Sequence, residues 1–275
     1  MDESQESSDY LHGYTDAEQG RLLRQARITE DLVHEGLSFP GSVDLLEVGC
    51  GVGAQTAILL RRHPALHITG IDASRSNLAA AAGYLATQPD AAERFTLVQG
   101  NAAELEFEDR RFDSAFLCFV LEHLADPLQV LCEVRRVLRP GSPVVCTEVQ
   151  NETFRLSPPC SATLSYWGAY NDLQRELGGD PNVGAKLGDL LLRAGFRDVR
   201  SEALTVHLDG GQPAARAAFL DYWTELLGSA APALLRAGRT GAAEVAAMQR
   251  ELAALAEDPQ GVFFYAGVRA WARVD

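Results

Sequence analysis

The chain has 275 residues, of which 47% are hydrophobic and 23% are charged, a balance typical of a globular protein that buries a large core. Its 24 basic and 38 acidic side chains give a formal net charge of -14, which repels the phosphates of nucleic acids and of anionic lipids. We therefore expect neither a nucleic acid nor a membrane among its partners. The length suits one large α/β domain, or a core domain with an added cap.

Targeting and redox features favour a cytoplasmic protein. The amino terminus has no basic segment followed by an apolar stretch, so we expect no signal peptide, and no window is long and apolar enough for a transmembrane helix. The five cysteines form no C-x-x-C pair. This pattern favours free thiols and argues against a disulfide framework and against a metal site.

The start of the chain is acidic, with six Asp or Glu and no Lys or Arg in the first twenty residues. Residues 1–12 are polar and rich in serine, which favours a disordered tail. Thr15 and Glu18 then form a capping-box pattern ahead of apolar residues at helical spacing. The pattern predicts a helix from about Asp16 to Leu37, ended by Pro40 and Gly41.

Short apolar runs alternate with helical stretches between residues 43 and 149. Several of the runs are almost continuously apolar, as strands covered on both faces should be. The alternation predicts a doubly wound, mostly parallel α/β sheet. The predicted strands are Val43–Val48, Leu66–Ile71, Phe95–Gln99, Phe112–Phe119 and Pro143–Val149, and the helices between them are Ala54–Arg62, Ser74–Thr87 and Pro127–Leu138.

After Val149 this rhythm changes, and the elements no longer repeat as strand and helix. We expect a loop over residues 151–159, and we expect the following segment to cap the sheet rather than to form an independent domain. The predicted helices are Cys160–Leu177, Leu187–Ala194, Ala214–Arg236 and Ala242–Glu257, and the predicted strands are Val199–Leu208 and Val262–Val274.

A glycine loop follows the first predicted strand and opens a helix. Glu47-x-Gly49-x-Gly51-x-Gly53 lies at the carboxyl end of that strand, where open α/β sheets bind ligands. Glycine is needed where the backbone takes a positive φ, or where a ligand comes closer than a Cβ allows. Because Gly49, Gly51 and Ala54 also fit the dinucleotide fingerprint G-x-G-x-x-A, the loop alone leaves a nicotinamide-dependent enzyme open.

Further motifs resolve this ambiguity, because they follow the loop in the order and spacing of one family. The loop resembles the E/D-x-G-x-G-x-G motif of class I S-adenosylmethionine (SAM) methyltransferases. The segment Tyr10-x-His12-Gly13-Tyr14 also resembles the start of bacterial small-molecule methyltransferases of this type. The downstream matches are Gly70-Ile71-Asp72-Ala73-Ser74, Gly100-Asn101-Ala102, Arg111-Phe112-Asp113-Ser114-Ala115, the stretch from Val120 to Pro127, and the stretch from Arg136 to Gly141.

The resemblance covers residues 43 to 149 and implies a Rossmann-like methyltransferase fold with a seven-stranded sheet. In this family the leading helix lies over the cofactor. We therefore expect an acidic tail and lid helix over residues 1–40 and a SAM-binding domain over residues 41–275. Helical cap elements are expected at about 151–195 and 213–257.

The resemblance also implies a role for individual residues at the SAM site. The glycines would wrap the methionine half, with Glu47 acting on its ammonium, and Asp72 would hold the ribose hydroxyls. Asn101 stands where the family more often has Asp, and its amide oxygen can still pair with the adenine amino group. The implied cofactor-binding residues are Tyr14, Glu47, Gly49, Gly51, Gly53, Gln55, Asp72, Ala73, Asn101, Ala102, Cys118 and Phe119.

Methyl transfer is an in-line displacement, so alignment and exclusion of water can supply most of the catalysis. A hydroxyl or ammonium acceptor must still lose a proton, and a base with a pKa near neutrality would help. His123 is the first candidate, although a Glu-His pair at this place could simply buttress the loop. Glu148, which ends the fifth strand, is the second candidate. His12 is a candidate only if the amino-terminal segment folds over the site.

The expected acceptor pocket is aromatic. Tyr166 and Tyr170 share one face of a predicted helix, and with Trp167 and Trp223 they could line an apolar pocket or pack the cap. Such a lining suits a hydrophobic acceptor and excludes water. It could also stabilise a carbocation through cation–π contacts, should the acceptor be an alkene carbon.

The sequence therefore predicts a SAM-dependent methyltransferase of a small, hydrophobic metabolite, such as a specialised metabolite. O- or N-methylation is favoured, and C-methylation of an isoprenoid or aromatic carbon is the alternative. Two alternatives come from other functional classes. One is a NAD-dependent oxidoreductase, and the other is a non-catalytic scaffold with a SAM-binding fold. The leading helix could dock on its own subunit or on another, so a homo-oligomer stays open.

Overall fold

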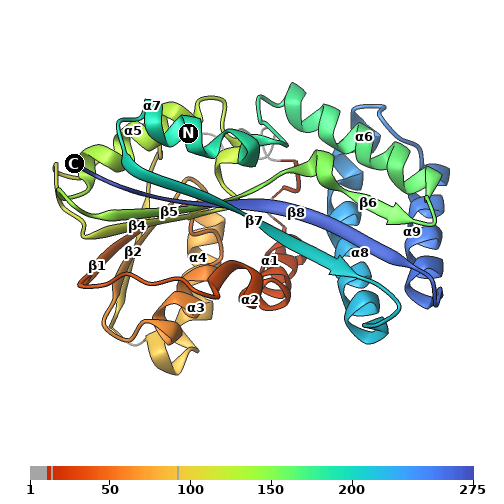
Figure 1. The fold of residues 1–275 in the computed structure, drawn as a ribbon, viewed down its shortest axis with the longest axis horizontal. Helices are drawn as coiled ribbons and strands as arrows, with labels where there is room; N and C mark the ends of the chain where they lie inside the picture. Colours follow the sequence, from red (N-terminus) through yellow and green to blue (C-terminus); the bar gives the residue numbers. More distant parts are fainter. Residues whose placement is uncertain (1–10, 14, 92) are drawn as a thin grey trace.

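The predicted doubly wound sheet is confirmed in a computed structural model, which describes residues 11–13, 15–91 and 93–275. Within these residues the sheet has eight strands in the order β3-β2-β1-β4-β5-β8-β6, and β7 pairs with the other edge of β8 (Figure 1). The strands from β1 to β5 are parallel, and β6, β7 and β8 are antiparallel to their neighbours. Their bounds are β1 Asp44–Val48, β2 His67–Asp72, β3 Phe95–Gln99, β4 Ser114–Cys118, β5 Pro143–Val149, β6 Arg155–Ser157, β7 Arg197–Leu208 and β8 Val262–Arg273.

Helices cover both faces of the parallel strands. On one face lie α3 (Ala54–Arg62) and α4 (Arg75–Ala86), and on the other lie α5 (Pro127–Val137) and α7 (Leu187–Arg193) (Figure 1). Neighbouring residues of one strand therefore enter different cores, with Leu45 in the cluster that contains Leu59 and Leu46 in the cluster that contains Leu131. This two-sided burial explains the almost continuous apolar runs of the sequence.

The leading helix is broken, where the sequence predicted a single helix from Asp16 to Leu37. Helix α1 spans Asp16–Ile28 and α2 spans Glu30–His34. Thr15 caps α1 as predicted, accepting a hydrogen bond from the Glu18 amide over 3.3 Å. The break falls at Thr29, whose hydroxyl donates to the Gln25 carbonyl over 2.8 Å and so competes with the backbone for that carbonyl. Of the disordered tail predicted over residues 1–12, residues 1–10 lie outside the described residues, as does Tyr14. The prediction is wrong for Leu11 and His12, which are buried.

Three long helices form the cap: α6 (Ser161–Glu176), α8 (Pro213–Arg236) and α9 (Ala242–Glu257), all within the described ranges. They enclose an aromatic cluster that includes Phe154, Tyr166, Trp167 and Trp223. The cap is smaller than predicted, because the end of the 151–195 range, α7, packs on the sheet beside α5 instead. The predicted loop over 151–159 contains β6, which raises the strand number above the expected seven. Single 3-10 turns span Pro89–Ala91, Leu121–His123, Asn151–Thr153 and Val183–Lys186.

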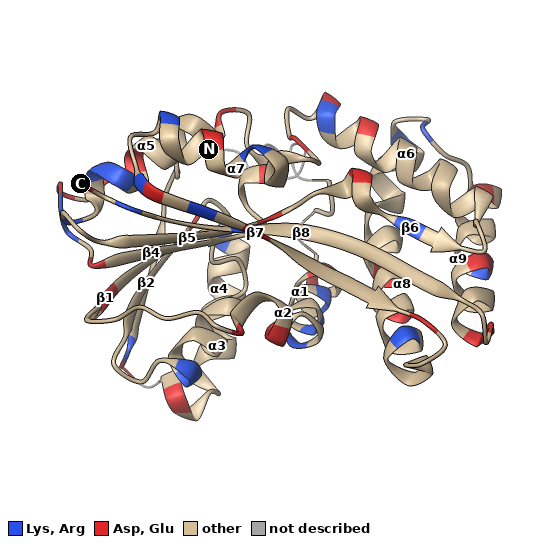
Figure 2. Ribbon diagram, in the orientation of Figure 1, with Lys and Arg blue, Asp and Glu red and all other residues tan. Residues whose placement is uncertain are grey.

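The last strand, β8, belongs to the sheet and to the cap. Its second half pairs with β5, from Gly267 to Arg273, and its first residues pair with β6. Phe263 and Tyr265 join the aromatic cluster of the cap, whereas Ala270 and Ala272 join the core between the sheet and α5. The distribution of charge along β7 and β8 follows the same division between sheet and cap. Figure 2 shows that the charged residues of these two strands lie at the end away from the cap.

Membrane-spanning helices are a separate question. Among the described residues, no helix is long and apolar enough to cross a bilayer.

A buried arginine holds the cap together and gives the first testable prediction. Arg216 of α8 is 1% exposed, and its guanidinium donates to the carbonyls of Gly261 and Asp258, each over 2.5 Å. Arg216→Met should lower the free energy of unfolding by about 2 kcal/mol, because it leaves buried carbonyls without a donor. Urea unfolding measures the loss, with the exposed Arg250→Met of α9 as the control. An equal loss in the two variants would contradict this role.

Candidate active site

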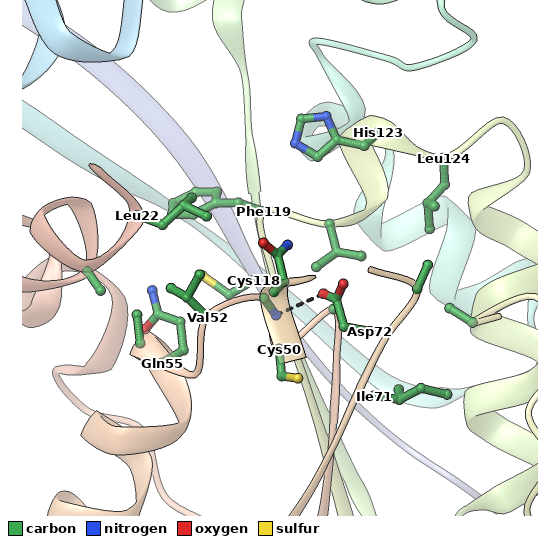
Figure 3. Close-up of a pocket in the computed structure, with 18 of the residues that line it drawn as sticks. Leu22, Cys50, Val52, Gln55, Ile71, Asp72, Cys118, Phe119, His123 and Leu124 are labelled. Carbon is green, nitrogen blue, oxygen red and sulfur yellow. Dashed lines mark hydrogen bonds between the residues drawn. The ribbon is translucent and has the colours of Figure 1, made fainter. Parts of the chain in front are cut away.

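The carboxyl ends of the parallel strands border a cavity of about 1130 Å³, counted with the space at its mouth. We call it the first cavity. The loops that follow β1, β2, β3 and β4 supply most of its wall, and helix α1 supplies Leu22, Gln25 and Ala26 (Figure 3). This is the edge at which open α/β sheets bind ligands.

The glycine loop turns sharply because the end of β2 holds it. The amides of Gly49 and Cys50 both donate to the Ile71 carbonyl, over 2.8 and 3.1 Å. The amide of Gly51 donates to an Asp72 carboxylate oxygen over 2.8 Å, the bond drawn dashed in Figure 3. Gly51 has a φ of +52°, and a Cβ built on it would meet no atom within 4 Å. The loop thus leaves room in the cavity for a ligand at Gly51.

The other two glycines serve packing more than the cavity. A Cβ on Gly49 would lie 2.5 Å from a methyl carbon of Val120, so this residue must be glycine for the loops to approach each other. Gly53 has a φ of +75° and packs against Leu85 of α4. Gly49 lines the first cavity as predicted, whereas Gly53 does not.

Two carboxyl groups flank the loop at different depths, one half-buried and one fully buried. Asp72 lines the first cavity and accepts bonds from the amides of Gly51 and Ser74, and burial raises its pKa. Glu47 lies behind the loop, is 2% exposed and does not line the cavity. Its carboxyl accepts a bond from the Thr56 hydroxyl over 2.6 Å, and burial raises its pKa to about 8.

The structure brings most of the other predicted cofactor residues to the first cavity. The Asn101 side-chain oxygen accepts a bond from the Ala103 amide over 3.0 Å, so this oxygen already serves the local turn. Gln55 is oriented by His34 of α2, whose Nε2 lies 2.6 Å from the Gln55 oxygen. The predicted residues that line this cavity are Gly49, Gly51, Gln55, Asp72, Ala73, Asn101, Ala102, Cys118 and Phe119.

A second cavity lies between the sheet and the cap, with a volume of about 700 Å³ including its mouth. Trp167, Tyr170 and Trp223 line it, as the sequence predicted. Tyr166 does not, because its hydroxyl points into the helix contact and donates to the Leu227 carbonyl over 2.7 Å. Sequence reasoning missed other lining residues. They are Asn151 in the predicted loop, and Val206, Phe219, Tyr222, Leu226 and Tyr265, whose apolar spacing looks the same as that of core positions.

Charged groups meet at the end of the second cavity that faces helix α1. Arg21 lines this end and forms a two-pronged ion pair with Glu18, with nitrogen–oxygen distances of 2.8 and 2.5 Å. Both side chains are buried, with 4% and 2% of the side-chain surface exposed. The His123 ring lies 3.6 Å from the Glu122 carboxylate, and both residues also line this cavity. An apolar cavity therefore has one polar end.

The three candidate bases take different positions. His123 lines both cavities. His12 lines the second cavity, within hydrogen-bond distance of Tyr170 and Ser229. Glu148 lines neither cavity, because it points under the loop after β4, where it accepts bonds from the amides of Val120 and Leu121. Burial and the nearby Glu122 raise its pKa to about 8, and its position suits holding the loop rather than meeting a ligand.

The two cavities are adjacent and share part of their walls. Leu22 and Gln25 of α1, with Phe119 and His123 from the end of β4, line both. Phe119 has a φ of +56°, an unusual backbone conformation for a bulky residue, and it stands between the two spaces. A ligand in one cavity would therefore touch residues that also touch a ligand in the other.

Comparison with known proteins identifies the part of the chain that builds this site. Residues 46–146 match the model of a methyltransferase domain family. Demethylmenaquinone methyltransferase of Staphylococcus aureus is 35% identical over 147 residues, which are 53% of this chain and 56% of that protein. The chain thus spans about half the length of the curated relatives it matches.

Solved structures extend the likeness to the whole fold. The [4+2]-cyclase SpnF is 26% identical, with a TM-score of 0.52 over 93% of this chain and 82% of that chain. Phosphoethanolamine N-methyltransferase 2 of Haemonchus contortus, solved with S-adenosylhomocysteine, has a TM-score of 0.58 over 97% of this chain and 60% of that chain. At 18% identity the second likeness concerns the fold alone.

The domain match begins in β1 and ends in β5, so it contains the glycine loop, Asp72 and the loop after β4. These are the segments that form the first cavity at the carboxyl edge of the sheet. The residues that supply most of the wall of the first cavity are therefore similar to a methyltransferase domain.

Proposed function

We propose that the protein transfers a methyl group from SAM to a small, hydrophobic molecule that binds in the second cavity. The observation that carries this proposal is the wall shared by the two cavities at Phe119 and His123. A transfer between two ligands needs their reacting atoms in contact and in line, with water excluded. A cofactor cavity that meets an aromatic cavity at one wall supplies that arrangement.

The first cavity offers groups that fit SAM. Asp72 would hold the ribose hydroxyls, and the open backbone at Gly51 would receive the methionine half. Glu47 would act on the ammonium through the loop or through water, and Gln55 would meet the carboxylate. Asn101 and Ala102 would border the adenine. SAM supplies a methyl group on a sulfonium, which is a leaving group that is already activated.

The protein's own residues would then align the acceptor and manage its proton. Phe119 and Leu22 would exclude water from the junction, since both present apolar side chains to the two cavities. His123 is the group best placed to accept a proton there, because it lines both cavities and lies beside the Glu122 carboxylate. A neutral imidazole in that position can take the proton that a hydroxyl or amine acceptor loses.

The lining of the second cavity favours an acceptor with an apolar body and one polar group. Trp167, Trp223 and Tyr265 supply aromatic surface, and Arg21, His123 and Glu122 supply polar groups at one end. This division supports O- or N-methylation. C-methylation remains the alternative within the class, because the same aromatic wall could stabilise a carbocation.

Cyclisation is a second candidate function, and the likeness to SpnF favours it. That [4+2]-cyclase is 26% identical to this chain and matches over 93% of it, cap included. A cyclase would fold an apolar substrate in the second cavity without consuming SAM. Release of S-adenosylhomocysteine in the presence of candidate acceptors separates the two functions, since a cyclase would change its substrate and release none.

Binding of SAM provides the second prediction. Asp72→Ala should weaken SAM binding at least tenfold in calorimetry, because it removes a half-buried carboxylate that would pair with two hydroxyls. Glu104→Ala, on the exposed turn after Asn101, is the control and should bind SAM as the wild type does. NAD should give no heat with either protein. Equal SAM affinity in Asp72→Ala and wild type would refute the ribose assignment.

The pH dependence of SAM binding provides the third prediction. Below pH 8 the Glu47 carboxyl of the ligand-free protein is largely protonated, since burial raises its pKa to about 8. A bound ammonium favours the carboxylate, so binding should release a proton and the affinity should rise with pH. We expect about a tenfold gain between about pH 6 and about pH 7.5, a range in which the SAM amine stays mostly protonated.

Glu47→Gln tests this assignment, because the amide keeps the shape of the side chain and does not titrate. Its SAM affinity should vary little over the same range, and calorimetry in two buffers should show no released proton. A wild-type pH dependence retained in Glu47→Gln would show that another group titrates on binding.

A further inference from the structure

We propose that Trp167 forms an end wall of the second cavity and sets the length of the molecule that this cavity accepts. The proposal rests on the proposed function only in taking the second cavity as the acceptor site. Trp167 lies on the cap helix α6, outside the residues that match the methyltransferase domain. The limit on length is therefore a property of the cap.

A third cavity lies behind the end wall, with a volume of about 390 Å³ including its mouth. It lies between α6 and the segment from Asn151 to Arg155, and it opens to solvent, because several of its lining residues are exposed. These exposed residues are Glu152, Arg155, Leu164 and Arg175. Among the residues that the structure describes, Asn151 and Trp167 alone line both the second and the third cavity. They therefore separate the aromatic cavity from solvent on this side of the cap.

The indole of Trp167 contacts side chains of both cavities. Its ring centroid lies 5.1 Å from that of Phe154, which lines the third cavity but not the second. The corresponding distances are 5.0 Å to Tyr170 and 5.5 Å to Trp223, which line the second cavity but not the third. Because the ring touches both sets of side chains, the indole itself forms the end wall.

Burial and hydrogen bonds hold the end wall in place. Trp167 is 7% exposed, and its indole N–H donates to the Asn151 carbonyl over 3.1 Å. The Asn151 side chain spans the wall, since its nitrogen donates to the Asn171 side chain over 2.7 Å and its oxygen accepts from the Tyr265 hydroxyl over 2.8 Å. A ligand that pushed the indole aside would take the donor from a buried carbonyl, which is costly. A long ligand thus meets a firm limit.

The class of ligand follows from the shape of this space. The second cavity has about 700 Å³ including its mouth, and Trp167 closes it at α6. A compact ring system fits such a space, whereas an alkyl chain that extends toward α6 meets the indole. Each methylene group buried against an apolar wall improves binding about fourfold, and a group forced into filled space weakens it. The expected acceptor is therefore compact and carries no long alkyl chain.

A series of para-alkylphenols, from ethylphenol to nonylphenol, tests the limit by calorimetry. S-adenosylhomocysteine is present to fill the first cavity. In the wild type the affinity should rise with each carbon to a maximum and then fall at least tenfold. In Trp167→Ala the second and third cavities merge, so the affinity should keep rising through nonylphenol. A wild-type affinity that rises through the whole series would overturn the proposal.

Trp223→Ala is the matched control, because it removes the same side chain from the second cavity without touching the third. Trp167 and Phe154 still close the enlarged space, so the maximum should move to a longer chain and persist. Loss of the maximum in both variants would contradict a special position of Trp167. Should Trp167→Ala fail to fold, Trp167→Leu carries the same prediction, since leucine lacks the ring that closes the wall.

A crystal structure of Trp167→Ala with nonylphenol reads the path of the chain, whether or not S-adenosylhomocysteine is bound. The chain should lie beside Phe154 and Leu164 in the third cavity, and a chain that leaves by another route would refute the end wall. The outcomes also separate this inference from the proposed function. A protein that turns over SAM without a length maximum keeps methyl transfer and loses the end wall. A maximum that depends on Trp167, without turnover of SAM, does the reverse.

Discussion

The position of both cavities depends on the antiparallel pairing of β8 with β5. Parallel strands present their carboxyl ends at one edge, and that edge carries the first cavity. Because β8 runs the opposite way, its residues before Gly267 extend beyond this edge. They carry Phe263 and Tyr265 into the cap, where β6 and β7 pair with the extension. The register of this one strand pair thus places the aromatic second cavity next to the first cavity.

Sequence reasoning predicted elements well where local patterns decide them. Helix α3 has the expected bounds, Ala54–Arg62, because the glycine loop opens it and basic residues close it. The same reasoning placed Asp72 and Asn101 correctly at the ends of strands. It could not separate Tyr166 from Tyr170, which share a helix face, because the packing of α8 decides which of them reaches the cavity.

The remaining errors have the same nonlocal origin. Glu148 ends a strand on the ligand edge, and the sequence cannot tell whether such an acid meets a ligand or the amides of Val120 and Leu121. Glu18 was counted with the acidic start of the chain and placed in the capping-box pattern, yet its carboxylate is buried against Arg21. His12 finds Ser229 at a separation of 217 residues, beyond any periodicity in the chain.

The shared wall at Leu22, Gln25, Phe119 and His123 has a thermodynamic consequence. When one occupant fixes these side chains, the other meets a wall that is already ordered, so the two affinities are linked. Linkage is reciprocal: the factor by which the cofactor tightens the acceptor is the factor by which the acceptor tightens the cofactor. In the proposed methyl transfer both occupants change at this wall, so each product would alter the release of the other.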